Sequence, residues 1–230
     1  MITFDAMPRE YQPICDLVTG RLKALEMLIR PETEDVGQYV KDIERANRIT
    51  ELDLSNIQHA LTLIKSNALP VPVSVNVSGR SLSDPAFCKD VMNLLRSHKH
   101  GNKLNFEITE TEPIANCEQA SSFMIDVQSY GVTISADDFG SGHMTLDMVK
   151  RLPFNYIKLD GSLTQNLQDP LVKETILELV NMKSDKSFEI VAEYVQNHQE
   201  VRQLRELGVD RGQGYFYSQP VPLERFQHSS

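Results

Sequence analysis

The sequence has few cysteines and no long apolar run. Its three cysteines, Cys15, Cys88 and Cys117, are odd in number, widely spaced and without a C-x-x-C pair. This pattern argues against a disulfide framework and predicts a reduced, cytoplasmic protein. No stretch of about 18 or more apolar residues is present, so we expect no transmembrane helix. The opening residues, MITFDAMPRE, also lack the basic flank and apolar core of a signal peptide.

Basic residues are in short supply. Lysine and arginine together number 23, against 32 aspartates and glutamates, which gives a net charge of −9. Tight binding to a nucleic acid polymer or an anionic membrane depends on basic residues that displace counterions, so we expect neither partner. A small anionic ligand is compatible with this charge if metal ions mediate its binding.

What is present is the composition of a folded domain, with 40% hydrophobic residues over 230 positions. This length suits one barrel-sized domain, which typically runs to about 250 residues. We therefore expect a single domain over residues 1–230 with a core at about 10–226. The clearest predicted strands are residues 71–78, 103–110, 132–138, 155–160 and 188–195. The predicted helical segments are 36–65, 85–98, 116–130, 144–151, 170–183 and 197–207.

Strands that alternate with helices indicate parallel β-α-β units. Three further short segments read as strands: YQPICDL at 11–17, RLKALEML at 21–28 and GQGYFYS at 212–218. The total of about eight strands favours a closed (β/α) barrel over an open sheet.

Polar residues occur near the carboxyl ends of nearly all these strands. They are Glu26, Asn76, Glu107, Asp137 with Asp138, Lys158, Glu193 and Gln213. In a parallel barrel such ends meet at one mouth, which is where active sites of this fold lie. We therefore expect these side chains to form one site.

Five of these side chains are carboxylates, which repel one another unless cations or raised pKa values compensate. Oxygen ligands without cysteine or paired histidine favour Mg²⁺, Mn²⁺ or Ca²⁺ over Zn²⁺. Two such ions, with Lys158 beside them, form a clamp suited to the attack of water on a phosphodiester. The residues alone leave the substrate open.

The motifs that carry these residues resemble the EAL domain family, whose members are cyclic di-GMP phosphodiesterases. They recur in the family's order along almost the whole chain: YQPI at 11–14, EML at 26–28, VNVS at 75–78, FEITE at 106–110, DDFGSG at 137–142, YIKLD at 156–160, VAEYV at 191–195 and GQGYFYSQP at 212–220. The resemblance implies a modified (β/α)8 TIM-like barrel with an antiparallel first strand. It also implies hydrolysis of cyclic di-GMP to linear pGpG with two Mg²⁺ or Mn²⁺ ions, and it favours a homodimer.

By position, the resemblance assigns a role to each motif residue. Metal ligands would be Glu26, Asn76, Glu107, Asp137, Asp138 and Glu193. Lys158 would contact the attacking water, Glu193 would promote its deprotonation, and Glu110 would anchor the loop after the aspartate pair. Substrate residues would be Gln12, Leu28, Arg30, Asp160 and Gln213.

Several positions depart from the family pattern. Met27 replaces an alanine, and the segment after Arg30 begins with Pro31 in place of tryptophan and is shorter. Tyr194 replaces a glycine, which costs strain if that position requires positive φ. Gln196 replaces a glutamate and so removes a charge.

These departures keep two other functions open beside hydrolysis of cyclic di-GMP. One is a catalytically silent module that binds cyclic di-GMP or a protein partner. The other is a different two-metal phosphohydrolase on the same barrel.

Overall fold

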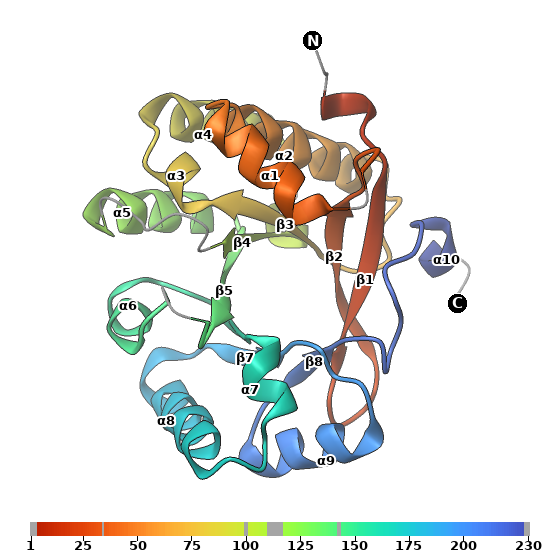
Figure 1. Ribbon diagram of the computed structural model, residues 1–230. Helices are drawn as coiled ribbons and strands as arrows, with labels where there is room; N and C mark the ends of the chain where they lie inside the picture. Colours follow the sequence, from red (N-terminus) through yellow and green to blue (C-terminus); the bar gives the residue numbers. More distant parts are fainter. Residues whose placement is uncertain (1–3, 34, 99–100, 110–116, 142–143, 228–230) are drawn as a thin grey trace.

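Eight strands close into a barrel in the computed structural model, which describes residues 4–33, 35–98, 101–109, 117–141 and 144–227 (Figure 1). The strands are β1 (Arg9–Asp16), β2 (Leu22–Ile29), β3 (Val73–Ser78), β4 (Leu104–Thr109), β5 (Thr133–Phe139), β6 (Tyr156–Leu159), β7 (Glu189–Ala192) and β8 (Arg211–Gln213). Each pairs with its neighbours in sequence order, and β8 closes the ring on β1. The predicted barrel is confirmed.

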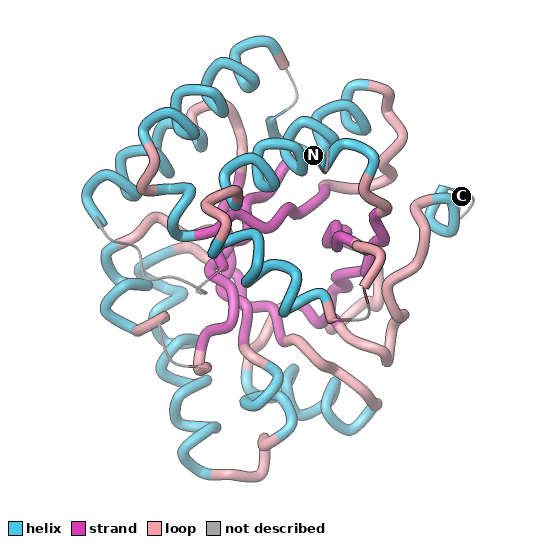
Figure 2. Tube along the Cα trace, turned by 45° about the horizontal axis from the view of Figure 1, so that its top comes forward, coloured by secondary structure: helices cyan, strands magenta, loops and turns pink. Residues whose placement is uncertain are grey.

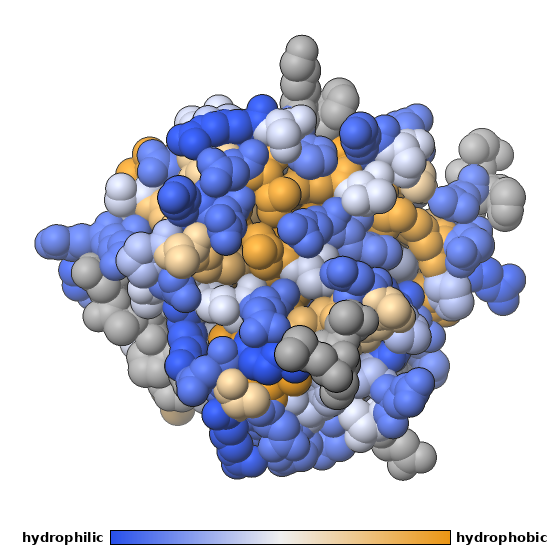
Figure 3. All heavy atoms as spheres, turned by 90° about the horizontal axis from the view of Figure 1, so that it is seen from above, coloured by the Kyte–Doolittle hydropathy of each residue, from blue (hydrophilic) through white to orange (hydrophobic). Residues whose placement is uncertain are grey.

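Helices surround the strands (Figure 2). They are α1 (Val36–Arg45), α2 (Ile49–Lys65), α3 (Gly79–Leu82), α4 (Pro85–Ser97), α5 (Cys117–Gln128), α6 (Leu146–Arg151), α7 (Gly161–Gln165), α8 (Pro170–Lys186), α9 (His198–Leu207) and α10 (Glu224–Gln227), with short 3-10 turns at Phe4–Ala6 and Gly101–Lys103. In the described part of the chain, none of these helices is both long and apolar enough to cross a bilayer. From above, hydrophilic residues cover most of the visible face, and hydrophobic residues show between them (Figure 3).

The first strand runs antiparallel to both β2 and β8, as expected from the family resemblance. The connection between β1 and β2 is only a turn, which can join antiparallel strands but cannot cross over to form a parallel pair. Asp16 holds this turn, because its carboxylate accepts hydrogen bonds from the backbone N–H groups of Val18 (3.1 Å) and Thr19 (2.7 Å). The antiparallel register then pairs Gln12 with Glu26 near the mouth.

Three expected elements differ clearly from the structure. The strand expected over 188–195 is only Glu189–Ala192, so Glu193 and Tyr194 lie in the loop that follows it. The helix expected over 36–65 is two helices, because the chain turns at Asn47, whose φ is +55°. An asparagine tolerates this left-handed conformation better than most residues. The last strand is only Arg211–Gln213, since Gly214 at φ +153° begins a turn. A Cβ at residue 214 would meet the backbone of Val195, so the chain needs a glycine there.

Side chains alternate along the regular parts of the strands, and this places the apolar core outside the barrel. Phe106 and Ile108 of β4 are buried in the main hydrophobic cluster with residues of the helices, while Asn105 and Glu107 face the interior. Asn105 donates hydrogen bonds to the hydroxyl groups of Ser74 (3.1 Å) and Ser135 (2.8 Å). These three residues form a hydrogen-bonded polar layer inside the barrel.

Asp53 links the outer helices to the barrel. It lies on α2, is buried, and accepts hydrogen bonds from the backbone N–H of Ser78 (2.9 Å) and the hydroxyl of Ser81 (2.6 Å). Burial raises the pKa of Asp53 to about 7, although these two hydrogen bonds oppose the shift. Its carboxyl group therefore keeps its proton to a higher pH in the folded chain than in the unfolded chain.

A pH-dependent stability follows from Asp53. Its unfolded carboxyl ionises near pH 4, so its contribution to the free energy of unfolding must fall as pH rises from about 4 to about 7 and then level off. Asp53→Asn has no ionisable group at this position, so it lacks this pH dependence. The difference in unfolding free energy, wild type minus variant, is therefore expected to fall over the same interval. Urea unfolding of both proteins between about pH 4 and pH 8 measures this difference. A difference that does not change with pH would contradict the prediction.

Candidate functional site

Lys158 lies at the centre of the barrel mouth among four carboxylates. Its Nζ lies 2.8 Å from an oxygen of Glu107, 2.8 Å from Glu193, 2.9 Å from Asp137 and 3.4 Å from Glu26. These residues come from or directly follow β6, β4, β7, β5 and β2. The structure therefore brings together the acids and the lysine that the sequence places at strand ends.

Burial disfavours the charged forms of these side chains. The side chain of Lys158 is 1% exposed. Burial acts to lower its pKa, but the carboxylates of Asp137, Glu107 and Glu193 outweigh burial and raise the pKa well above its usual value. Lys158 therefore stays protonated and provides one positive charge.

One ammonium does not compensate all the acids. Burial raises the pKa of Glu107 to about 8, against the attraction of Lys158. Burial likewise raises the pKa of Asp137 and raises that of Glu193 well above its usual value. Of the four acids that contact Lys158, only Glu26 has a lowered pKa, because Lys158 and further hydrogen bonds outweigh its burial. The site thus has a deficit of positive charge that cations would relieve.

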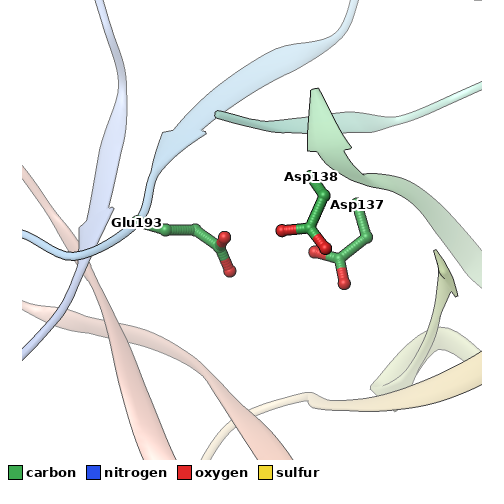
Figure 4. A group of neighbouring side chains, drawn as sticks. All are labelled: Asp137, Asp138 and Glu193. Carbon is green, nitrogen blue, oxygen red and sulfur yellow. The ribbon is translucent and has the colours of Figure 1, made fainter. Parts of the chain in front are cut away.

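Asp137 and Asp138 reach the same site because β5 is irregular where they lie. The pairing of β5 with β6 shifts register between Ala136 and Phe139, and Asp138 has a φ of +50°. Such a bulge breaks the alternation of side chains and redirects one of them. One oxygen from each aspartate and one from Glu193 lie within 4.8 Å of one another, and Figure 4 shows these three carboxylates close together.

Two buried oxygen atoms of the site have no hydrogen-bond partner in the described part of the chain. The amide Nδ2 of Asn76 donates to Glu26 (3.3 Å), while its Oδ1 is buried without a hydrogen-bond partner. Oε1 of Glu107 is likewise buried and unpartnered. Buried acceptors normally have partners, and an all-oxygen donor set is the one that Mg²⁺ and Mn²⁺ prefer. The residues present therefore fit the expected metal ions.

Two cavities flank the charged residues, and both are lined by Glu26 and Leu28. The larger, of about 450 Å³, is also lined by Gln12, Gln213 and Asp138. The smaller, of about 240 Å³, is lined by Arg30, Asn76 and Asp137 together with apolar residues of α1 and α2. Each of the two aspartates thus faces a different cavity.

The residues expected to bind substrate are placed in different ways. Gln213 donates hydrogen bonds to Gln12 (3.0 Å) and Glu26, and these bonds fix the orientation of the two glutamine side chains in the larger cavity. Arg30 pairs with Glu10 at 2.7 Å beside the smaller cavity. Asp160 instead caps α7 through the backbone N–H of Ser162 (2.9 Å). Glu110, the expected anchor of the loop after the aspartate pair, lies outside the described residues.

Tyr194 has a positive φ of +54°, the condition under which its replacement of a glycine was expected to cost strain. The left-handed conformation costs a non-glycine residue roughly 1–2 kcal/mol. Tyr194 and Gln196 both line the larger cavity. The family departures therefore lie in the wall of the site rather than among the carboxylates.

Sequence reasoning missed part of the site. Gln165 and Tyr215 also line the larger cavity, and neither had been singled out. The polar residues of the barrel interior, Ser74, Asn105 and Ser135, each precede a site residue by two positions. A search for polar residues with a period of two along the strands would have found those three.

Comparisons with known proteins agree with this geometry. A cyclic di-GMP phosphodiesterase of Pseudomonas aeruginosa is 28% identical over 94% of this chain, which spans only 39% of that relative. An EAL domain protein structure from Listeria monocytogenes EGD-e superposes with a TM-score of 0.88, at 26% identity and with 97% of this chain and 92% of that one covered. The structure of the PaMucR phosphodiesterase in complex with c-di-GMP superposes with a TM-score of 0.85 at 26% identity. The match covers 96% of this chain and 99% of that one. Residues 6–220 match the EAL domain model, and the chain belongs to the EAL domain family.

Proposed function

We propose that this chain hydrolyses cyclic di-GMP to linear pGpG with Mg²⁺ or Mn²⁺ as cofactor. The observation that carries the proposal is the group of four buried carboxylates around Lys158, joined by Asp138 in a triad that could hold a metal ion. The curated relative named as a cyclic di-GMP phosphodiesterase supports the choice of substrate.

The residues that would hold the metals are divided by their position around the mouth. Glu26, Asn76, Glu107 and Asp137 would bind one ion, and Asp137, Asp138 and Glu193 would bind or border the second. Two divalent cations would supply Lewis acidity for the attacking water and charge neutralisation for the phosphoryl oxygens. They would also provide the positive charge that Lys158 alone does not.

The chain's own side chains would perform the remaining steps. The Lys158 ammonium would orient the attacking water and stabilise developing negative charge. Glu193, which has a carboxylate oxygen 2.8 Å from Nζ of Lys158, would accept the proton of that water. Arg30 would contact a phosphate of the substrate.

The two cavities suit a ligand with two nucleotide halves. Both border the charged residues, so a phosphodiester at the carboxylates would direct one nucleoside toward each cavity. Gln12, Leu28 and Gln213 would line the path of the substrate. Asp160 would support the nucleotide pocket indirectly, by capping the start of α7. Glu110 stays a predicted anchor for the loop after the aspartate pair.

A second candidate function is a silent receptor for cyclic di-GMP or an adaptor for a protein partner. The strained Tyr194 and the neutral Gln196 in the wall of the larger cavity favour it. Binding without turnover would establish the receptor, and turnover of other phosphodiesters in a substrate panel would establish a different phosphohydrolase. A single domain over 1–230, a homodimer and a cytoplasmic location remain further proposals.

Removal of Glu26 tests the main proposal. Purified wild type with Mg²⁺ or Mn²⁺ is expected to convert cyclic di-GMP to pGpG, and Glu26→Ala is expected to lose at least about 100-fold in kcat. Glu178→Ala is the matched control and is expected to keep the wild-type rate, because Glu178 is an exposed acid on α8 that lines neither cavity. Chromatography of the product measures the rates of all three proteins. Absence of pGpG from the wild type, beside an active control enzyme, would reject hydrolysis.

Asp137→Asn separates metal binding from folding. Because burial raises the pKa of Asp137, a neutral amide there is expected to leave the metal-free melting temperature unchanged or higher. Mn²⁺ at about 100 times its Kd is expected to raise the melting temperature of the wild type by roughly 5 °C or more, but not that of the variant. Thermal melts with EDTA and with Mn²⁺ measure both effects. A large loss of stability in EDTA would show that Asp137 is mainly structural.

A further inference from the structure

Tyr194 is an exposed aromatic residue held at the edge of the site. It directly follows Glu193, its side chain is 58% exposed, and it lines the larger cavity together with Tyr215, which is 66% exposed. Large aromatic side chains are normally mostly buried because they contribute large apolar areas. Two exposed tyrosines in one cavity wall therefore call for a ligand that covers them.

The backbone of Tyr194 is in an unfavourable conformation. Its φ is +54°, where L-residues with bulky side chains are uncommon. Strained residues of this kind concentrate at functional sites, where the surrounding structure holds them. Here the holding contact is with Gly161, because ring atoms of Tyr194 occupy the space that a Cβ at position 161 would need. The absence of a side chain at Gly161 lets the ring pack against the start of α7.

The rest of this cavity is rich in amides, with acids at one end. Gln12, Gln165, Gln196 and Gln213 line it, and Glu26, Asp138 and Glu193 lie where it meets the proposed metal site. Amides offer both donors and acceptors, and aromatic rings offer a flat apolar face. Together these groups match a purine base, which is recognised by stacking on its face and by hydrogen bonds to its edge.

We propose that the ring of Tyr194 is a stacking platform for the guanine base of the nucleotide half that enters the larger cavity. The amides of Gln165 and Gln196 line the same cavity and offer hydrogen bonds to the edge of that base. This inference rests on cyclic di-GMP as the proposed ligand. It assigns a binding role to a position where the family pattern has a glycine.

Three variants test the platform. Tyr194→Phe keeps the ring, and Tyr194→Gly removes the ring while relieving the positive φ. Ser187→Gly is the matched backbone control, because Ser187 has a φ of +55° and is exposed at the end of α8, away from the cavity. Calorimetry with cyclic di-GMP, in Ca²⁺ in place of Mg²⁺, measures Kd, and chromatography checks that no pGpG forms during the titration.

The expected Kd for Tyr194→Gly is at least about 10-fold weaker than that of the wild type, which is the scale of a lost base-aromatic stack. Tyr194→Phe is expected to stay within about 2-fold, and Ser187→Gly is expected to bind like the wild type. Melting temperatures distinguish this loss from unfolding, because the glycine variant relieves strain and should not melt earlier than the wild type.

Each other outcome has a defined meaning. Equal affinity in all four proteins overturns the platform, and tighter binding by Tyr194→Gly shows that the ring obstructs the cavity. Binding that depends on Tyr194 without later turnover in Mg²⁺ or Mn²⁺ retains the platform and rejects hydrolysis. Absence of binding by the wild type rejects both the platform and the proposed substrate.

Discussion

The charge balance around Lys158 is the constraint on which the rest of the structure depends. Four carboxylates lie within 3.4 Å of one buried ammonium, so the lysine cannot be removed without leaving several acids at the bottom of the site with no positive charge beside them. This explains why the barrel interior is polar and why the apolar core lies between the strands and the helices. The fold is built around a charged centre that an ordinary hydrophobic barrel would exclude.

The same balance affects how cations would enter. Lys158 already contacts the oxygens of Glu107, Asp137 and Glu193 that the proposed metals would use. A divalent ion at this site would therefore compete with the ammonium for these oxygens, and the lysine would shift as the ion bound. The raised pKa values of the acids also mean that metal binding would release protons from the site. Both effects would make the affinity for metal lower than the number of carboxylates alone suggests.

The sequence predicted the convergence of the site but not its fine geometry. Strand spacing was enough to place Glu107 and Lys158 at one mouth, because parallel strand ends meet there. The antiparallel β1 came from the family resemblance, although the short turn held by Asp16 supplies its physical reason. The break at Asn47 and the end of β8 at Gly214 depend on single left-handed or extended backbone residues. A hydrophobic pattern does not indicate such local conformations. Among these residues, the positive φ was considered from the sequence only for Tyr194, because it replaces a glycine of the family pattern.

The bulge in β5 has a consequence for the kinds of mutation this site tolerates. Two adjacent acids face one site only because one extra residue interrupts the pairing between Ala136 and Phe139. Loss of Ala136 or Phe139 would restore regular pairing and turn one acid toward the helices, and loss of Asp137 or Asp138 would remove an acid outright. A deletion there is therefore more damaging than a substitution, because it changes the direction of a side chain as well as its chemistry. The length of the chain between β5 and its loop is as much a part of the site as the identity of Asp137 and Asp138.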